Sequence, residues 1–137
     1  MSDKAALITA RGVIQPSDCD LMQHLNTASY VRIFDTATWG LLFELGYRPR
    51  AWATRGHGWA DVRQEISYQH ELRVGDLYIV ESGVERLGRT SVSSVHVLKN
   101  VELAIECARL TQVTVQIDVG ARRPTPLPEG FGSPIAT

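Results

Sequence analysis

The sequence predicts an α+β domain in which one long, buried helix is wrapped by a curved antiparallel β-sheet. Three observations support this fold class. Apolar residues recur with helical spacing over residues 27–45, polar and apolar residues alternate after residue 58, and tight turns separate the alternating segments. An apolar helix and a sheet in one small chain must bury each other. We therefore expect the sheet to curl around the helix.

The segment 27–45 has the clearest helical pattern in the chain. Its main apolar face is formed by residues spaced four, three, four and four apart: Tyr30, Phe34, Ala37, Leu41 and Leu45. Other apolar residues around the segment predict a helix that is more than half enclosed by protein. Asn26 or Thr27 is suited to cap its start, and Gly46 stands where a left-handed residue would end it.

Five strands are expected around this helix, over residues 5–15, 58–68, 76–87, 89–99 and 104–118. Because short turns separate the last four, they are predicted to form an antiparallel meander. The segment between the helix and residue 58 is expected to be a loop. The proline-rich tail from about residue 122 is expected to lie extended on the surface. No linker divides the chain, so residues 1–137 form one domain.

The charge balance excludes several classes of partner. The 137 residues include 14 basic and 15 acidic side chains, and the formal net charge is −1. This balance provides no surface for nucleic acid or an anionic membrane. No apolar run approaches the roughly 18 residues of a membrane-spanning helix, and the apolar stretch near the N-terminus is too short for a signal peptide. With two cysteines expected as free thiols, Cys19 and Cys107, we expect a cytoplasmic protein.

The densest polar stretch, residues 17–26, comes directly before the helix. A carboxylate there can serve as general base or nucleophile, and the free N–H groups of a helix start can stabilise an oxyanion. Asp20, His24 and Asn26 are the candidates, spaced by four and two residues. The same residues also fit a purely structural interpretation, with Asp20 as a turn former, His24 as a half-exposed loop histidine and Asn26 as a helix cap.

This stretch and the segments after it resemble the hot-dog-fold acyl-CoA thioesterases of the 4-hydroxybenzoyl-CoA thioesterase type. The resemblance runs from about residue 8 to 129 and includes Asp18-Cys19-Asp20, residues 23–30, Phe34-Asp35, Leu45-Gly46, residues 66–68, 74–76, 87–91 and 122–129. It implies a hot-dog fold, with Asp20 as nucleophile or general base and the helix N-terminal amides as oxyanion hole. It also implies that His24 and Asn26 position the substrate, the loop or a water molecule.

The chain departs from the family at Gln23, where glycine is common. Glycine permits backbone angles that other residues rarely adopt, so the loop shape depends on how Gln23 is accommodated. Its amide is also a candidate substrate contact. The remaining substrate-binding candidates are Tyr30 near the loop, Trp52 and Trp59 as an aromatic wall or as core packing, and Arg86 and Arg89 for the phosphates of coenzyme A.

The function implied is hydrolysis of an acyl-CoA thioester to the free acid and coenzyme A, with an aromatic, short-chain or betaine-like acyl group. The reaction needs no metal and no cofactor apart from the coenzyme A of the substrate, and paired zinc-ligand spacing is absent from the sequence. An exposed sheet edge predicts a homodimer or homotetramer. Two alternatives remain open: a non-catalytic acyl-CoA-binding module, and a hot-dog dehydratase or hydratase, whose histidine and acidic partner follow a differently ordered motif.

Overall fold

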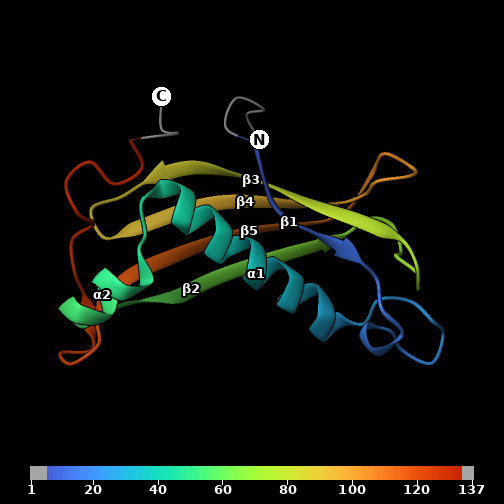
Figure 1. The fold of residues 1–137 in the computed structure, drawn as a ribbon, viewed down its shortest axis with the longest axis horizontal. Coiled ribbons are helices and arrows are strands. Elements are labelled where there is room, and N and C mark those ends of the chain that lie inside the picture. Colours follow the sequence, from blue (N-terminus) through green and yellow to red (C-terminus); the bar gives the residue numbers. More distant parts are fainter. Residues whose placement is uncertain (1–5, 134–137) are drawn as a thin grey trace.

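The computed structural model describes residues 6–133. Figure 1 shows one long helix lying across one curved sheet. The elements in chain order are β1 (Leu7–Val13), the 3-10 helix η2 (Pro16–Asp18), α1 (Thr27–Leu45), α2 (Pro49–Arg55), β2 (His57–Tyr68), β3 (Leu77–Leu87), β4 (Ser91–Asn100), β5 (Ile105–Asp118) and β6 (Arg123–Pro124). The expected strands and the long helix are thus confirmed to within a few residues of their ends.

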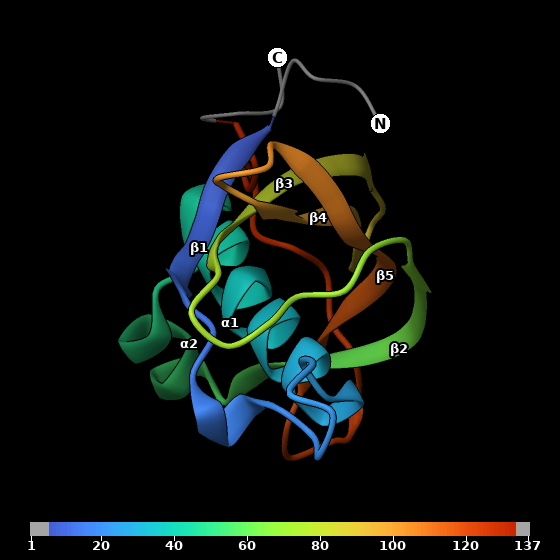
Figure 2. The same ribbon diagram turned by 90° about the vertical axis from the view of Figure 1, so that its right-hand side faces the viewer.

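The sheet is antiparallel throughout and has the order β1-β3-β4-β5-β2, with β6 added beside β5. Seen along the helix, it curls around α1 from β1 on one side to β2 on the other (Figure 2). Helix α1 packs mainly on β1, β3 and β4. The predicted α+β architecture of a helix wrapped by a curved sheet is confirmed.

The ends of α1 follow from two residues that the sequence indicates. The Asn26 side chain accepts a hydrogen bond from the Ser29 N–H (2.8 Å), and Gly46 ends the helix at φ 121°. The predicted apolar face is buried against the sheet. On the opposite face, Val31, Trp39 and Phe43 are 39–48% exposed, so this part of the helix is not covered within one chain.

The predicted four-strand meander is wrong for its first strand. β3, β4 and β5 pair in succession, whereas β2 pairs with β5 at the far edge of the sheet. The connection from β2 to β3, residues 69–76, is long enough to cross beneath the start of α1 (Figure 2). A tight turn would have forced neighbouring strands to pair, but this longer connection does not.

The segment expected to be a loop after α1 contains the short helix α2. Pro49 occupies its first turn, Gly56 ends it in the left-handed conformation at φ 71°, and Trp52 anchors it with only 4% exposure. Seven residues are too few to display two helical periods. The proline and glycine at its two ends were the available signals.

The tail is only partly a surface strand. β6 pairs with the end of β5, but Leu127 and Phe131 pack against the buried leucines of the C-terminal half of α1. The Gly132 N–H also donates to the Leu45 carbonyl (2.7 Å). The tail therefore closes one end of the core, and Pro134 lies outside the described residues.

A belt of hydrogen-bonded polar side chains crosses the buried face of the sheet between two apolar clusters. It joins all five long strands and α1, in the order Thr9, Ser82, His96, Gln112 and Gln64, with Ser94 and Thr38 attached. Burial lowers the pKa of His96 from 6.5 to about 4, so the ring is neutral near pH 7. His96 is thus a buried core residue whose ring nitrogens are hydrogen-bonded.

Candidate active site

The loop before α1 is a small hairpin held by its own backbone. The Asp20 N–H donates to the His24 carbonyl (2.9 Å), and the Gln23 N–H donates to the Asp20 carbonyl (2.9 Å). Cys19 and Leu25 form an isolated β-bridge at its base. Because these bonds are between main-chain groups, the side chains of the loop are left free for other contacts.

The two aspartates of the loop have different environments. Asp18 accepts hydrogen bonds from the Gln15 N–H (3.0 Å) and from the Arg32 guanidinium (2.6 Å), so both of its oxygens are occupied. Asp20 accepts the N–H groups of Met22 (2.8 Å) and His24 (3.3 Å) through Oδ1 alone. No described residue bonds Oδ2 of Asp20, which leaves this exposed carboxylate oxygen available to a substrate or water.

Gln23 adopts the backbone conformation that glycine would permit. Its φ is 64°, in the left-handed region, one of three described non-glycine residues with positive φ. The turn therefore keeps its shape without glycine, at a strain cost of about 1 kcal/mol. The departure from the family pattern at this position leaves the Asp20 turn intact.

The His24 imidazole contacts a residue that the sequence analysis missed. Its Nε2 lies 3.2 Å from Oε2 of Glu71, in the connection between β2 and β3. The backbones of His24 and Arg73 also form an isolated antiparallel β-bridge, and the Leu25 N–H donates to the Leu72 carbonyl (2.8 Å). No spacing in the sequence indicates this contact, because it depends on the connection that crosses beneath the helix.

The start of α1 adds unpaired donors and an aromatic wall to the loop. Asn26 caps the helix through Ser29, which leaves the N–H groups of Thr27 and Ala28 without helical acceptors. Tyr30 packs edge to face on Tyr68, with ring centroids 4.9 Å apart. Burial, followed by nearby anionic groups, raises the pKa of Tyr30 to about 12, so its hydroxyl stays protonated.

A cavity of about 140 Å³ opens beside these residues. It is lined by Tyr30, Tyr68, Gln69, His70 and Glu71. Through Glu71 it adjoins His24, and through Tyr30 it adjoins the first turn of α1. The structure therefore brings five of the predicted site residues together around one end of the helix: Asp20, Gln23, His24, Asn26 and Tyr30.

The other four predicted residues lie at the opposite end of α1, which is 19 residues or roughly 28 Å long. Trp52 donates to Gln116 (2.6 Å), and Trp59 packs on Tyr47 and Phe131 near the helix C-terminus. Arg86 and Arg89 are exposed at the turn from β3 to β4, beside the same apolar cluster. Within one chain, these two tryptophans and two arginines are therefore separated from the Asp20 loop by the length of α1.

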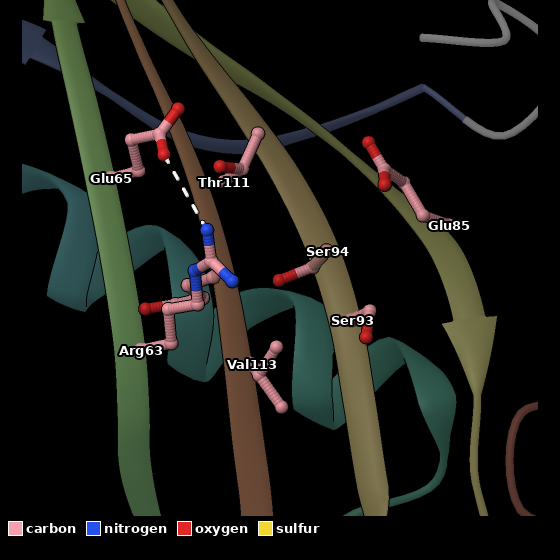
Figure 3. Close-up of a pocket in the computed structure, with 8 residues that line it drawn as sticks. Arg63, Glu65, Glu85, Ser93, Ser94, Thr111 and Val113 are labelled. Carbon is pink, nitrogen blue, oxygen red and sulfur yellow. Dashed lines mark ion pairs between the residues drawn. The ribbon is translucent and has the colours of Figure 1, made fainter.

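A second cavity, of about 250 Å³, is lined mainly by polar side chains of four strands. Figure 3 shows it in front of the sheet with a helix behind, and Arg63 and Glu65, both on β2, form an ion pair at 3.7 Å at one side of it. Both side chains are 73% exposed. This cavity is separate from the Asp20 loop.

The loop offers no thiol nucleophile. Burial and the adjacent carboxylates of Asp18 and Asp20 raise the pKa of the Cys19 thiol, which keeps it protonated. Within residues 6–133, no three histidine, cysteine, aspartate or glutamate side chains gather closely enough to hold a metal ion. Asp20 is thus the carboxylate of this loop that keeps an oxygen without a hydrogen bond from a described residue.

Comparisons with known proteins agree with this fold. The family model of the thioesterase-like superfamily matches residues 14–135. A Staphylococcus aureus protein solved in complex with CoA has a TM-score of 0.87 at 16% identity, over 99% of this chain and 86% of its own. A putative Pseudomonas putida thioesterase has a TM-score of 0.79 at 24% identity, over 91% and 79% of the two chains.

A third structure, a 1,4-dihydroxy-2-naphthoyl-CoA thioesterase from Synechocystis, has a TM-score of 0.81 at 17% identity, over 93% of this chain and 94% of its own. No curated protein sequence matches the chain. All three structural likenesses fall below 25% identity and therefore show the fold, while the family model covers nearly the whole chain. The chain belongs to the thioesterase-like superfamily and has its hot-dog fold.

Proposed function

We propose that this protein hydrolyses an acyl-CoA thioester to the free acid and coenzyme A, with Asp20 as the reacting carboxylate. One observation carries the proposal. Asp20 lies on the loop that leads into the N-terminus of α1, is held there through Oδ1, and keeps Oδ2 uncommitted. A fixed carboxylate next to unpaired helix N–H groups is the arrangement that acyl transfer needs.

In the proposed reaction, the N–H groups of Thr27 and Ala28 stabilise the oxyanion that develops on the thioester oxygen. Oδ2 of Asp20 either takes a proton from the attacking water or attacks the carbonyl carbon itself, after which water cleaves the resulting anhydride. The C–S bond breaks, the sulfur leaves as the coenzyme A thiolate, and hydroxyl from water remains on the acid. Water and substrate are the only reactants, and coenzyme A enters as part of the substrate.

We propose a homodimer as the minimal active unit, with a homotetramer as the larger form. β2 is an edge strand of twelve residues, and its five consecutive residues 61–65 are exposed. The tip of the Asp20 loop carries Leu21 and Met22, which are 103% and 70% exposed. Apolar residues at this exposure beside a reactive carboxylate favour coverage by a second copy or by substrate.

The charges on β2 favour pairing with a second β2. If a twofold axis passes near Gln64, Arg63 faces Glu65 of the partner subunit, and the same contact repeats on the other side of the axis. Antiparallel pairing also places the start of the partner's β2, which carries Trp59, beside the end of this strand and Tyr30. The two separated groups of site residues would then meet, with Arg86 and Arg89 supplied by the partner for the phosphates of coenzyme A.

Charge reversal tests this interface. Arg63→Glu should shift the protein from dimer towards monomer in light scattering at micromolar concentration, and Arg63→Glu combined with Glu65→Arg should restore the dimer. A parent protein that is monomeric and fully active would contradict the interface.

We also propose the cytoplasm as the compartment of this protein, where the free thiols of Cys19 and Cys107 persist.

For the acyl group we propose an aromatic, short-chain or betaine-like chain. The aromatic side chains near both ends of α1 support this choice, as does the aromatic acyl-CoA that the Synechocystis thioesterase is named for. The test is thiol release from a panel of short, aromatic, long and cationic acyl-CoAs. Release of free coenzyme A from none of them would reject the hydrolase and leave the acyl-CoA-binding module.

A hydratase or dehydratase is the second candidate, because the structure pairs His24 with Glu71. A histidine with an acidic partner is the acid–base pair such chemistry uses. Hydration of an enoyl-CoA consumes the conjugated double bond and leaves the thioester intact. Loss of enoyl absorbance without thiol release would therefore identify this activity, whereas thiol release alone would exclude it.

A further inference from the structure

The contact between His24 and Glu71 joins two segments that are separated by 47 positions in the chain. Nε2 of His24 and Oε2 of Glu71 lie 3.2 Å apart. The His24 side chain is 24% exposed and that of Glu71 is 61% exposed. The glutamate is therefore accessible from the cavity beside Tyr30 and also within hydrogen-bond range of the imidazole.

The main chain around this pair is fixed on both sides. On one side, the His24 N–H donates to Oδ1 of Asp20, and its carbonyl accepts the Asp20 N–H. On the other side, Leu72 is fully buried next to Glu71, and its carbonyl accepts the Leu25 N–H. The His24 backbone is thus hydrogen-bonded to Asp20, and the backbone beside Glu71 is hydrogen-bonded to Leu25, so little ordering of the main chain is needed when substrate binds.

We propose that Glu71 is a positioning residue for the reaction and that it acts through His24. The carboxylate accepts the Nε2–H of the ring, which fixes the ring orientation and its tautomer. In the neutral ring Nδ1 is then an acceptor, and it receives a hydrogen bond from the water that attacks the thioester. This inference rests on the proposed hydrolase function and assigns a residue that the sequence pattern alone does not indicate.

The test compares kcat and KM for the best acyl-CoA of the panel in Glu71→Ala, Glu71→Gln and His24→Gln, and in Glu71→Ala combined with His24→Gln. Glu71→Ala should lower kcat about tenfold with little change in KM. Glu71→Gln keeps an acceptor without the charge and should fall between the parent and Glu71→Ala. In the His24→Gln background, Glu71→Ala should have no additional effect, because its partner is already missing.

Glu102→Ala, in the exposed turn between β4 and β5, is the matched control and should keep the parent kcat. If Glu71→Ala keeps the parent kcat as well, or if its effect persists in the His24→Gln background, the proposal is overturned. Nitrogen NMR of His24 provides a readout independent of activity. The parent should show a single Nε2–H tautomer that becomes a mixture in Glu71→Ala, and identical spectra would reject the positioning role.

The two readouts separate this proposal from the function on which it rests. A parent protein that releases no thiol from any acyl-CoA rejects the hydrolase, while the NMR comparison still decides whether Glu71 orients His24. A parent that hydrolyses acyl-CoA and is indifferent to Glu71→Ala keeps the hydrolase and rejects the role of Glu71.

Discussion

The two ends of α1 are built in opposite ways. At the N-terminal end, the polar loop around Asp20 is held by main-chain hydrogen bonds, and its side chains are largely exposed. At the C-terminal end, Leu41, Leu42 and Leu45 are buried in a cluster that also contains Trp59 and Phe131. One helix therefore presents free N–H groups and a carboxylate at one end and apolar packing at the other.

This difference separates reactivity from stability along one element. A loop held by its backbone tolerates side-chain replacement without unfolding, since the groups that hold it remain. A packed aromatic and aliphatic cluster does not, because each deletion leaves a cavity. Substitutions at the N-terminal end should therefore reduce turnover, and those at the C-terminal end should reduce the free energy of unfolding.

The largest expected effect is from Asp20→Asn. The amide oxygen can still accept the Met22 and His24 N–H groups, so the loop and the melting temperature should be maintained. Turnover should fall by roughly 10²–10⁴-fold, the contribution of a positioned acid–base group. Thiol release and thermal melting measured on the same preparations check both statements. A folded variant with near-parental turnover would transfer the role to Asp18 or remove it from this loop.

The opposite end is tested by Leu45→Ala. Leu45, the last residue of α1, is fully buried against the tail and the sheet. Truncation should lower the free energy of unfolding by about 2–5 kcal/mol, measured by denaturant titration. Turnover of the folded fraction should change less than twofold. A large loss of kcat with unchanged stability would show that the two ends are not independent.

Acid should destabilise the centre of the molecule, between the two ends. The pKa of His96 is about 4 in the folded protein and 6.5 ordinarily, so the unfolded chain binds the proton first as the pH falls. The contribution of neutral His96 to the free energy of unfolding is complete above pH 6.5. As the pH falls from 6.5 to 4, this contribution is lost and the free energy of unfolding decreases by about 3 kcal/mol. The side chains that bond it, Ser82, Ser94 and Gln112, are uncharged.

Denaturant unfolding at pH 7 and pH 4.5 measures this loss. His96→Gln should show a smaller drop between the two pH values than the parent, whatever its stability at pH 7. His70→Gln, an exposed histidine, should keep the parental drop. Equal drops in the parent and in His96→Gln would remove the histidine as the source of acid sensitivity.

The smallest expected effect decides whether the C-terminal end takes part in binding at all. In Trp59→Leu, apolar bulk is kept and the aromatic face is lost. If the partner's Trp59 lines the acyl site, a quaternary ammonium acyl-CoA should lose about 0.5–2 kcal/mol of binding, and a neutral one of similar size should lose less. Equal losses, or a parental preference for palmitoyl-CoA, would assign the tryptophans to packing alone.

Local pattern was sufficient to predict α1 and the strands, because the period of their apolar residues reports which face is buried. The Asn26 cap and the Gly46 terminus were readable for the same reason, since each depends on one residue and its neighbours. The placement of β2 beside β5 was not readable. It depends on the path of an eight-residue connection, which no periodicity describes.

The residues of the candidate site also divide into those that are neighbours in sequence and those that only the path of the chain brings together. Asp20, Gln23 and His24 belong to one loop, and their proximity follows from sequence neighbourhood. Glu71 is brought to the loop by the crossing connection and could not be found by spacing. Trp59 packs near the other end of α1, and its suggested role in an aromatic wall stays a prediction that depends on a second subunit.

The polar belt across the sheet also has a consequence for how the chain selects its strand register. Each strand contributes a side chain that is hydrogen-bonded to particular partners on its neighbours, up to 73 positions away. A slip of one residue in β4 would turn His96 to the other face and break its bonds to Ser82 and Gln112. Each buried group left unpaired costs about 1–3 kcal/mol. A slip of two residues would keep valines and leucines on the buried face but separate His96 from Ser82 and Gln112, so the belt opposes register errors that hydrophobic burial alone would allow.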